Sequence, residues 1–423
     1  MRSAGIATVA ENRLARLLPE RVPDIPSAGT PALLFRSPLV ASCVCRKIRQ
    51  HRKPHRPESA VNSRLAKVAL LSVSTVLAVI VGEASLRFVF HAVPQLELDI
   101  YRKQDGLLLL RPNLDRRHVT RQWDVGVRTN SEGWRDQGSE TSWGMVLGLG
   151  DSFAFGWGVE AQQCFYSLVE KRIGAEVTNA GVPGTATVDQ ERLLEALIPH
   201  YRPRFVVLAF FVGNDFTETG FGGAERLEVI EGFLHLKPIE GQDPQRSWVR
   251  RLASRSHILQ LLRAMQFRMG GSTQPSGQPR TWDAWMREFA QVHLQRPSAR
   301  AEEAIQTTLE SLDRIADRCS RDGIRLAVLA IPRSFQVEER ERAEMQTALG
   351  LTLEDLDMDK PQRILHEWAA GKDVVLVDPL DDFKARQATG ARLYHSPDAH
   401  LTAAGHAAAA EALAKALAAQ AKL

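Results

Sequence analysis

The chain has 423 residues, of which 44% are hydrophobic and 25% charged, so it is not collagen-like, a coiled coil or disordered throughout. Four cysteines in a chain of this length cannot form a disulfide framework, and Cys43 and Cys45 are too close together for the paired cysteines of a zinc ribbon. The net charge of +4 conceals an asymmetry, since residues 1–67 carry 13 Lys/Arg against 4 Asp/Glu and the remainder is acidic. The body of the chain therefore has no electrostatic reason to bind nucleic acid.

Residues 1–64 are rich in Arg, Pro, Ser and Ala and show no sustained helical or strand period. Their densest charge is the run Arg46–Lys53. Such a run binds nucleic acid or anionic lipid in some proteins, but more often it is a solvated feature of a tail. We predict a basic, disordered cytoplasmic tail over 1–64.

An apolar segment follows the tail. Val68–Gly82 carries no charge, and the apolar character resumes up to Phe90, so the segment reaches the roughly 20 residues of a membrane span only by including Glu83 and Arg87. Those two side chains are four apart on one helix face and can pair or extend to the membrane surface. Because a basic flank stays in the cytoplasm, we predict a single-pass signal anchor over 65–90 in the inner (cytoplasmic) membrane, with the rest of the chain on the extracytoplasmic side. The alternatives are a buried core helix and a cleaved signal peptide.

Five short apolar runs flanked by Gly, Pro, Asn or Asp are typical of buried parallel strands. They are Gly144–Leu149, Glu176–Asn179, Phe205–Val212, Ile324–Ile331 and Val374–Val377. Amphipathic stretches separate them, which implies right-handed crossovers. The prediction is an approach segment over 91–140 and then, over 141–423, a flavodoxin-like, three-layer α/β/α sandwich with a parallel sheet.

Residues 217–300 interrupt this alternation. They are rich in glycine and carry Trp248, Trp282 and Trp285 among several basic residues. The residues alone leave two interpretations open: an insertion that forms a lid over the site, or a flexible surface excursion.

Polar motifs stand where several predicted strands end. They are Gly150–Gly156, Asn179–Thr185 and Gly213–Asp215, with Ser396–His400 close to the C-terminus. In a parallel α/β sheet, ligands bind at the carboxyl ends of the strands. A serine at a strand-to-helix turn, as Ser152 is, has an exposed hydroxyl and an amide at a helix N-terminus, which suits a nucleophile. Taken alone, Ser152 could equally be a helix N-cap or part of a phosphate-binding turn.

In this order the four motifs resemble those of the SGNH, or GDSL-type, hydrolases, over residues 100–220 and 305–420. The segment Val127–Asp136 is similar to what precedes the domain in membrane-anchored bacterial members. The resemblance implies a serine esterase with Ser152 as nucleophile, His400 as general base and Asp398 as the acid that orients it.

The same resemblance implies an oxyanion hole formed by the amides of Ser152 and Gly184 and by the side chain of Asn214. It implies an SGNH-like catalytic domain that acts on an O-acylated, for example acetylated, carbohydrate or lipid at the cell envelope. No metal or organic cofactor is expected, and nothing in the sequence has the spacing of a metal site.

The spacing Asp398-x-His400 departs from the common Asp-x-x-His and resembles members related to polysaccharide O-acetyltransferases. Hydrolysis and acetyl transfer share one acyl-enzyme intermediate, so both stay open. A third hypothesis is a non-catalytic carbohydrate-binding or scaffold protein that keeps the fold.

Other titratable residues are expected to have structural roles. We predict that His406 is a surface or capping residue and that Asp378 caps the segment after the last strand. We predict that Asp215 fixes the loop beside Asn214 and does not react, and that His395 is a loop residue, the alternative being a group that supports the triad. Cys164 and Cys319 either pair in an oxidising compartment or remain buried free thiols.

Overall fold

The computed structural model describes residues 59–88, 98–120, 122–135, 146–237, 256–268, 287–396 and 398–420. Most of the predicted tail over 1–64 and the three tryptophans of the predicted insertion lie outside these residues. The chain divides into two units, Met1–Ala66 and Lys67–Leu423, and all the predicted site residues belong to the second.

The first helix, α1, extends over Ser59–Phe88, and its segment Leu65–Leu86 is long and apolar enough to cross a membrane. Among the described residues, none of that segment is buried, whereas a core helix would be mostly buried. Glu83 accepts hydrogen bonds from the backbone N–H of His257, at 2.7 Å, and of the next residue, at 3.1 Å. This carboxylate therefore caps the first turn of α7 (His257–Arg268).

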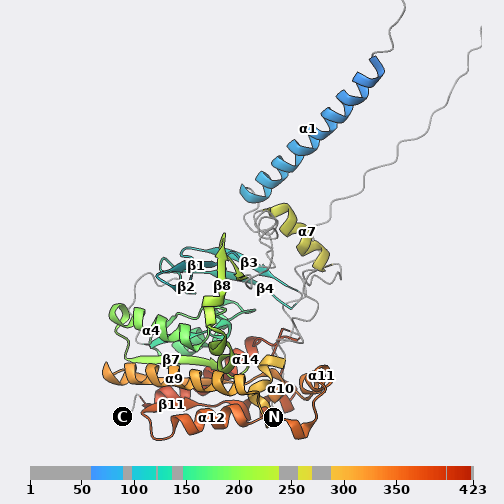
Figure 1. Cartoon of the computed structure of the whole chain (residues 1–423). Helices are drawn as coiled ribbons and strands as arrows, with labels where there is room; N and C mark the ends of the chain where they lie inside the picture. The colour runs from blue at the N-terminus through green and yellow to red at the C-terminus, as the bar shows by residue number, and fades with distance from the viewer. Residues whose placement is uncertain are drawn as a thin grey trace, which may run out of the picture. The chain divides into compact units, whose positions relative to one another are not determined.

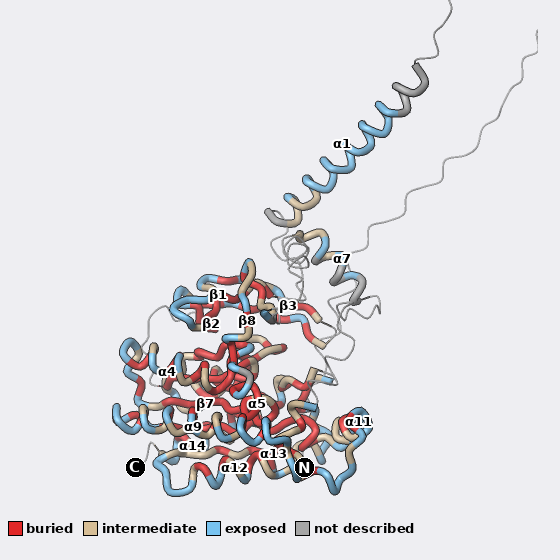
Figure 2. Tube along the Cα trace, viewed as in Figure 1, coloured by how far each residue is buried: buried red, intermediate tan, exposed pale blue. Residues whose placement is uncertain are grey.

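The five predicted strands form one parallel sheet, as the sequence led us to expect. The order of the strands in it, which the sequence did not predict, is β11-β10-β7-β5-β6. Their bounds are β5 Val146–Gly150, β6 Val177–Asn179, β7 Phe205–Phe211, β10 Arg325–Ile331 and β11 Val374–Val377. The central strands β5, β7 and β10 are almost wholly buried, because apolar side chains leave both of their faces. The red core of Figure 2 includes this sheet.

Helices cover both faces of the sheet and complete the three layers (Figure 1). On one face lie α4 (Thr187–Tyr201), α9 (Ala299–Arg321) and α12 (Lys360–Ala369). On the other lie α3 (Phe165–Ile173), α13 (Leu380–Ala388) and α14 (Ala403–Gln420). The apolar stripe of α9, which includes Leu312, Ile315 and Cys319, packs on the sheet.

The positions of Cys164 and Cys319 in the two helical layers show whether they can form a disulfide. Cys164 is buried in the layer of α3 and α14, and Cys319 in the layer of α9, so the sheet separates them. Both are free thiols, and the hypothesis of a disulfide between them is wrong.

Three antiparallel hairpins that the sequence analysis did not identify lie outside the sheet. They are β1 (Tyr101–Gln104) with β2 (Leu107–Leu110), β3 (Asp115–Val119) with β4 (Asp124–Arg128), and β8 (Leu227–Ile230) with β9 (Phe233–Leu236). The first hairpin contacts the third, since the N–H of Tyr101 donates to the carbonyl of Gly232 at 2.9 Å. Single 3-10 turns occur at Ala161–Gln163, Thr219–Phe221, Gly223–Arg226, Gln291–His293 and Leu353–Asp355.

Candidate active site

The turn after β5 presents Ser152 at the start of the short helix α2 (Ser152–Phe155). Gly150 has φ 143°, and a Cβ there would lie 2.7 Å from the Cβ of Ala154, so only glycine fits this turn. Asp151, which is 1% exposed, caps the helix by accepting the N–H of Phe153 at 2.9 Å. The serine is thus held at a rigid strand-to-helix junction.

The structure places the three predicted triad residues in hydrogen-bond contact. His400 Nε2 lies 2.8 Å from Ser152 Oγ, although the two residues are 248 positions apart. On the other side of the ring, Nδ1 hydrogen-bonds Asp398 Oδ1. Burial alone would raise the pKa of Asp398, but the charge of His400 and its hydrogen bonds outweigh this and hold the pKa below its usual value. An ionised Asp398 fixes the tautomer that leaves Nε2 free to accept the serine proton.

Two backbone N–H groups are available at this site. Within the described part of the chain, neither Ser152 N nor Gly184 N donates a hydrogen bond. Gly184 is exposed and has φ 83°, and a Cβ there would lie 2.9 Å from Cδ2 of Leu234 on β9. A side chain at position 184 would therefore be strained and would crowd the hairpin beside it.

The side chain of Asn214 is held by two carboxylates. Its Nδ2 donates to Oδ2 of Asp151 at 3.2 Å and to Oε2 of Glu218 at 3.1 Å. Glu218 ends the short helix α5 (Asp215–Glu218) and also pairs with Arg226 at 3.1 Å. Burial raises the pKa of Glu218 to about 7. The sequence analysis missed Glu218, although its position four residues after Asn214 places it one helical turn away.

A buried arginine from the approach segment also contacts the nucleophile turn. Arg135 is 2% exposed, and its guanidinium donates to the carbonyls of Phe155, at 2.8 Å, of Gly156, and of Val159, at 2.5 Å. It also donates to Gly126 in β4, at 3.2 Å. Arg135 therefore ties the approach segment to the loop that follows Ser152.

His406 is buried rather than at the surface, which corrects one part of our expectation. Its Nδ1 accepts the N–H of Phe165 at 3.2 Å, so it caps the first turn of α3 from the neighbouring α14. Burial lowers the pKa of His406 to about 3, so the ring is neutral and can accept. The Ala-rich α14 approaches α3 closely enough to enclose the imidazole, which helical spacing alone could not predict.

The remaining predicted structural residues behave as expected. Asp215, the first residue of α5, accepts the N–H of Phe211 at 2.7 Å and so fixes the turn between β7 and α5. Asp378 caps α13 by accepting the N–H of Leu380 at 3.1 Å. His395 lies in the loop before the triad histidine, and its N–H donates to the carbonyl of His400 at 2.8 Å.

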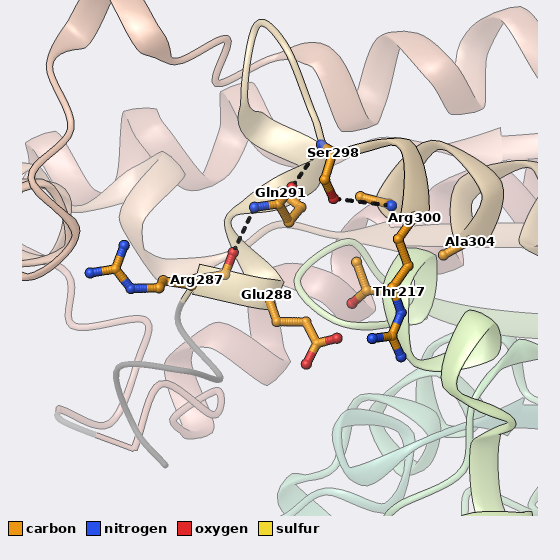
Figure 3. A pocket seen from close by; sticks show the side chains of 8 residues that line it. Thr217, Arg287, Glu288, Gln291, Ser298, Arg300 and Ala304 are labelled. Atoms are coloured by element: carbon orange, nitrogen blue, oxygen red, sulfur yellow. Dashed lines mark hydrogen bonds between the residues drawn. The ribbon is translucent and has the colours of Figure 1, made fainter. Parts of the chain in front are cut away.

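A pocket beside α5 and the start of α9 contains none of the predicted site residues (Figure 3). Its lining includes Thr217, Glu288, Gln291 and Arg300. Among the residues that the structure describes, no group of three or more His, Cys, Asp or Glu is arranged to hold a metal ion.

No protein-family model and no curated protein matches the chain. Several solved structures are similar to the chain. One is a lipolytic protein of the G-D-S-L family from Desulfitobacterium hafniense DCB-2, which is 12% identical with a TM-score of 0.31. The match covers 64% of this chain and 98% of that protein. A variant of an acetyl-xylooligosaccharide esterase from Geobacillus Stearmophilus has 13% identity and a TM-score of 0.33, covering 64% and 92%. A two-domain esterase active on acetylated mannans has 15% identity and a TM-score of 0.34, covering 64% and 48%.

Proposed function

We propose that the chain is a serine esterase of the SGNH type, with Ser152 as nucleophile, His400 as general base and Asp398 as its orienting acid. The observation that carries this proposal is the continuous hydrogen-bonded row from Ser152 Oγ through the imidazole to the Asp398 carboxylate. A serine hydroxyl is a weak nucleophile unless a base and the base's orienting group are both within reach. Here both are.

In the first half of the reaction, Ser152 Oγ attacks the carbonyl carbon of the ester while its proton moves to His400 Nε2. The carbonyl oxygen becomes an oxyanion, which the free N–H groups of Ser152 and Gly184 can bind. Asn214 would add a third donor if one of its N–H groups turns from a carboxylate towards the oxyanion. The bond to the leaving alcohol then breaks, the alcohol takes the proton from His400, and an acyl-enzyme remains.

In the second half, an acceptor hydroxyl attacks the acyl-enzyme, and His400 takes the acceptor's proton and returns one to Ser152. If the acceptor is water, the product is a free acid; if it is a sugar hydroxyl, the acyl group is transferred. The short Asp398-x-His400 spacing resembles that of members related to polysaccharide O-acetyltransferases, so an envelope-polysaccharide O-acetyltransferase is the second candidate.

We further propose that α1 anchors the enzyme in a membrane, with the catalytic residues on the extracytoplasmic side. The length and apolarity of Leu65–Leu86 and the basic residues before it support this orientation. The substrate would then be an O-acylated carbohydrate or lipid of the cell envelope. A reporter fused after residue 91 should be active only outside the cytoplasm, and a cytoplasmic signal would contradict both the orientation and the envelope substrate.

The predicted insertion supplies a wall beside the site, since Leu234 on β9 lies next to Gly184. We propose that this part of residues 217–300 acts as a lid. Replacing all of 217–300 would also remove Glu218, which holds Asn214, so the test replaces only the hairpin 227–236 with a short Gly/Ser turn. This change should alter the preference among esters, whereas identical kinetics on every ester would make the hairpin a surface excursion.

The test of the serine mechanism is labelling with a fluorophosphonate probe, followed by peptide mapping. We expect labelling at Ser152 and at no other serine. His400→Ala should nearly abolish it, because the hydroxyl loses its proton acceptor, and Asp398→Asn should slow it by up to about 10⁴-fold. Asn214→Ala should affect ester turnover more than labelling, because it serves the oxyanion.

The outcomes separate the three hypotheses. A folded protein whose Ser152 reacts no faster than in His400→Ala would leave only the non-catalytic binding or scaffold protein. If Ser152 is labelled, product analysis of an acetylated glycan with and without an added sugar acceptor distinguishes hydrolysis from transfer.

A further inference from the structure

Arg333 is a buried arginine that the proposed reaction does not use. It follows β10 by two residues, at the carboxyl edge of the sheet that also presents Ser152 and Asn214, and it is 7% exposed. Its backbone N–H donates to Oε1 of Gln336 at 2.8 Å, within the short helix α10 (Ser334–Val337). The position of its Cα is therefore fixed.

Three phenylalanine rings surround the guanidinium. Its Cζ lies 5.4 Å from the ring centroid of Phe211, 5.3 Å from that of Phe289 and 5.7 Å from that of Phe335. Aromatic faces attract a guanidinium and so reduce the free-energy cost of burying it. They do not replace the hydrogen bonds that its five N–H donors make with a planar anion.

The charge of Arg333 has no direct counter-ion in the described part of the chain. No carboxylate there lies within 4.0 Å of its guanidinium, and its buried Nε has no hydrogen-bond partner. The carboxylates that act on it from further away are engaged elsewhere: Glu341 with Ser396, Asp398 with His400, and Glu218 with Arg226. Buried charges are normally paired, so an unpaired one suggests that the missing anion belongs to a ligand.

The guanidinium lies close to the proposed reaction centre but not in it. The ring of Phe211, which Arg333 covers, stacks on Phe153 at 3.8 Å, and Phe153 packs against the triad histidine with centroids 4.8 Å apart. A Cβ at Gly213 would lie 2.7 Å from Cδ of Arg333, so the arginine runs along the loop that presents Asn214. An anion bound here would belong to a part of the substrate beside the ester, not to the ester itself.

We infer that Arg333 binds a carboxylate of the substrate, which makes the substrate an O-acylated acidic saccharide, with a uronic acid next to the acylated sugar. This inference rests on the proposed esterase function of Ser152 and names the substrate class of that site. A guanidinium recognises a carboxylate through two parallel N–H···O bonds, which gives both affinity and orientation. The anion supplies the counter-charge that the chain lacks.

The experiment compares two probes on the full-length protein in detergent: an acetylated oligogalacturonide, and the same oligosaccharide after its carboxylates have been amidated. Acetate release gives kcat/KM for each. We expect the wild type to prefer the carboxylate form by about tenfold or more, as charge-assisted hydrogen bonds allow. Arg333→Gln should remove that preference, mainly through a higher KM, and leave both turnover of the amidated probe and fluorophosphonate labelling of Ser152 unchanged.

Two further variants serve as controls. Arg333→Lys keeps the positive charge but lacks the planar guanidinium that donates two parallel hydrogen bonds, and it should retain part of the preference for the carboxylate probe. Arg340, whose side chain is 82% exposed and paired with Glu344, is the matched arginine, and Arg340→Gln should behave like the wild type. Calorimetric binding of the unacetylated oligogalacturonide supplies a readout that needs no turnover, and its Kd should weaken about tenfold or more in Arg333→Gln.

The inference is overturned if the wild type treats the two probes alike and binds the oligogalacturonide no better than Arg333→Gln does. It is also overturned if Arg333→Gln lowers turnover of both probes and labelling of Ser152 to the same extent, since that would make the arginine a structural residue. If Arg333→Gln does not fold, the inference is decided by the wild type alone, through the ratio of its kcat/KM values for the carboxylate and amidated probes. Failure of the esterase proposal gives a different result, since Ser152 is then not labelled and neither probe releases acetate. In that case the calorimetric comparison of the wild type with Arg333→Gln decides whether Arg333 binds the carboxylate.

Discussion

Replacing Arg135 with methionine tests whether this residue of the approach segment holds the nucleophile turn in place. The guanidinium donates to four backbone carbonyls, three of which follow Ser152, and it also lies 4.5 Å from the ring centroid of Phe155. Methionine fills a similar volume but donates nothing, so those carbonyls lose their partner in a dry environment.

The expected loss in the free energy of unfolding follows from the number of hydrogen bonds that the substitution removes. An unpaired buried carbonyl costs about 1–3 kcal/mol, while removing the buried guanidinium returns part of its desolvation free energy. We therefore expect Arg135→Met to lower the free energy of unfolding by about 3–5 kcal/mol, the range found when one partner of a buried charged contact is lost. Arg135→Lys, which keeps the charge but cannot reach all four carbonyls at once, should lose less.

The assay is urea unfolding of the full chain in detergent, followed by tryptophan fluorescence, together with the rate of fluorophosphonate labelling at Ser152. Arg135→Met should lower both the unfolding midpoint and, under native conditions, the labelling rate. The control is Arg340→Met on the exposed surface, which should leave both unchanged. If Arg135→Met behaves like Arg340→Met, the turn does not depend on this arginine and our account of it is wrong.

Three further predictions concern the core and the carboxylates around Asn214. In Gly148→Ala the new Cβ would lie 2.6 Å from Cζ of the buried Tyr166, so thermal unfolding should show a loss of about 1–3 kcal/mol; an unchanged midpoint would mean that the ring has room to move. Tyr166→Phe removes a hydroxyl whose single proton lies between the carbonyl oxygens of Leu149, at 2.7 Å, and Val207, at 2.9 Å. The change should cost about 1–3 kcal/mol by urea unfolding, and a smaller loss would be evidence that water replaces this contact. Glu218 has a pKa raised from 4.5 to about 7, so its ionisation opposes folding and the wild type should lose stability as pH rises from about 4.5 to about 7. Glu218→Gln cannot ionise, so between pH 5 and pH 8 its stability relative to the wild type should rise by an amount on the order of 3 kcal/mol, and a difference that does not change with pH would show that Glu218 titrates normally.

The sequence by itself determined the parallel sheet, the membrane-span candidate and the polar motifs at the ends of the strands. These features are readable because they are local. A buried parallel strand such as β7 is an apolar run that begins after a proline and ends before a glycine and an asparagine, and the polar residues of the site follow directly at its carboxyl end. The pairing of Ser152 with His400 was predictable only through the resemblance, because nothing local links residues 248 positions apart.

The tertiary structure decided what depends on contacts between distant segments. The sheet order, which places Cys164 and Cys319 on opposite faces, and the burial of His406 against α3 leave no mark in a local pattern. The hairpins β1–β2 and β3–β4 have strands of only four or five residues, too short for a clear period. In the sequence Arg135 and Arg333 look like ordinary charged residues of loops. Only the folded chain shows that Arg135 donates to four backbone carbonyls. It also shows that Arg333 is enclosed by aromatic rings with no described carboxylate within 4.0 Å. The reason is that packing, and not the neighbours in sequence, sets the partners of a charged group.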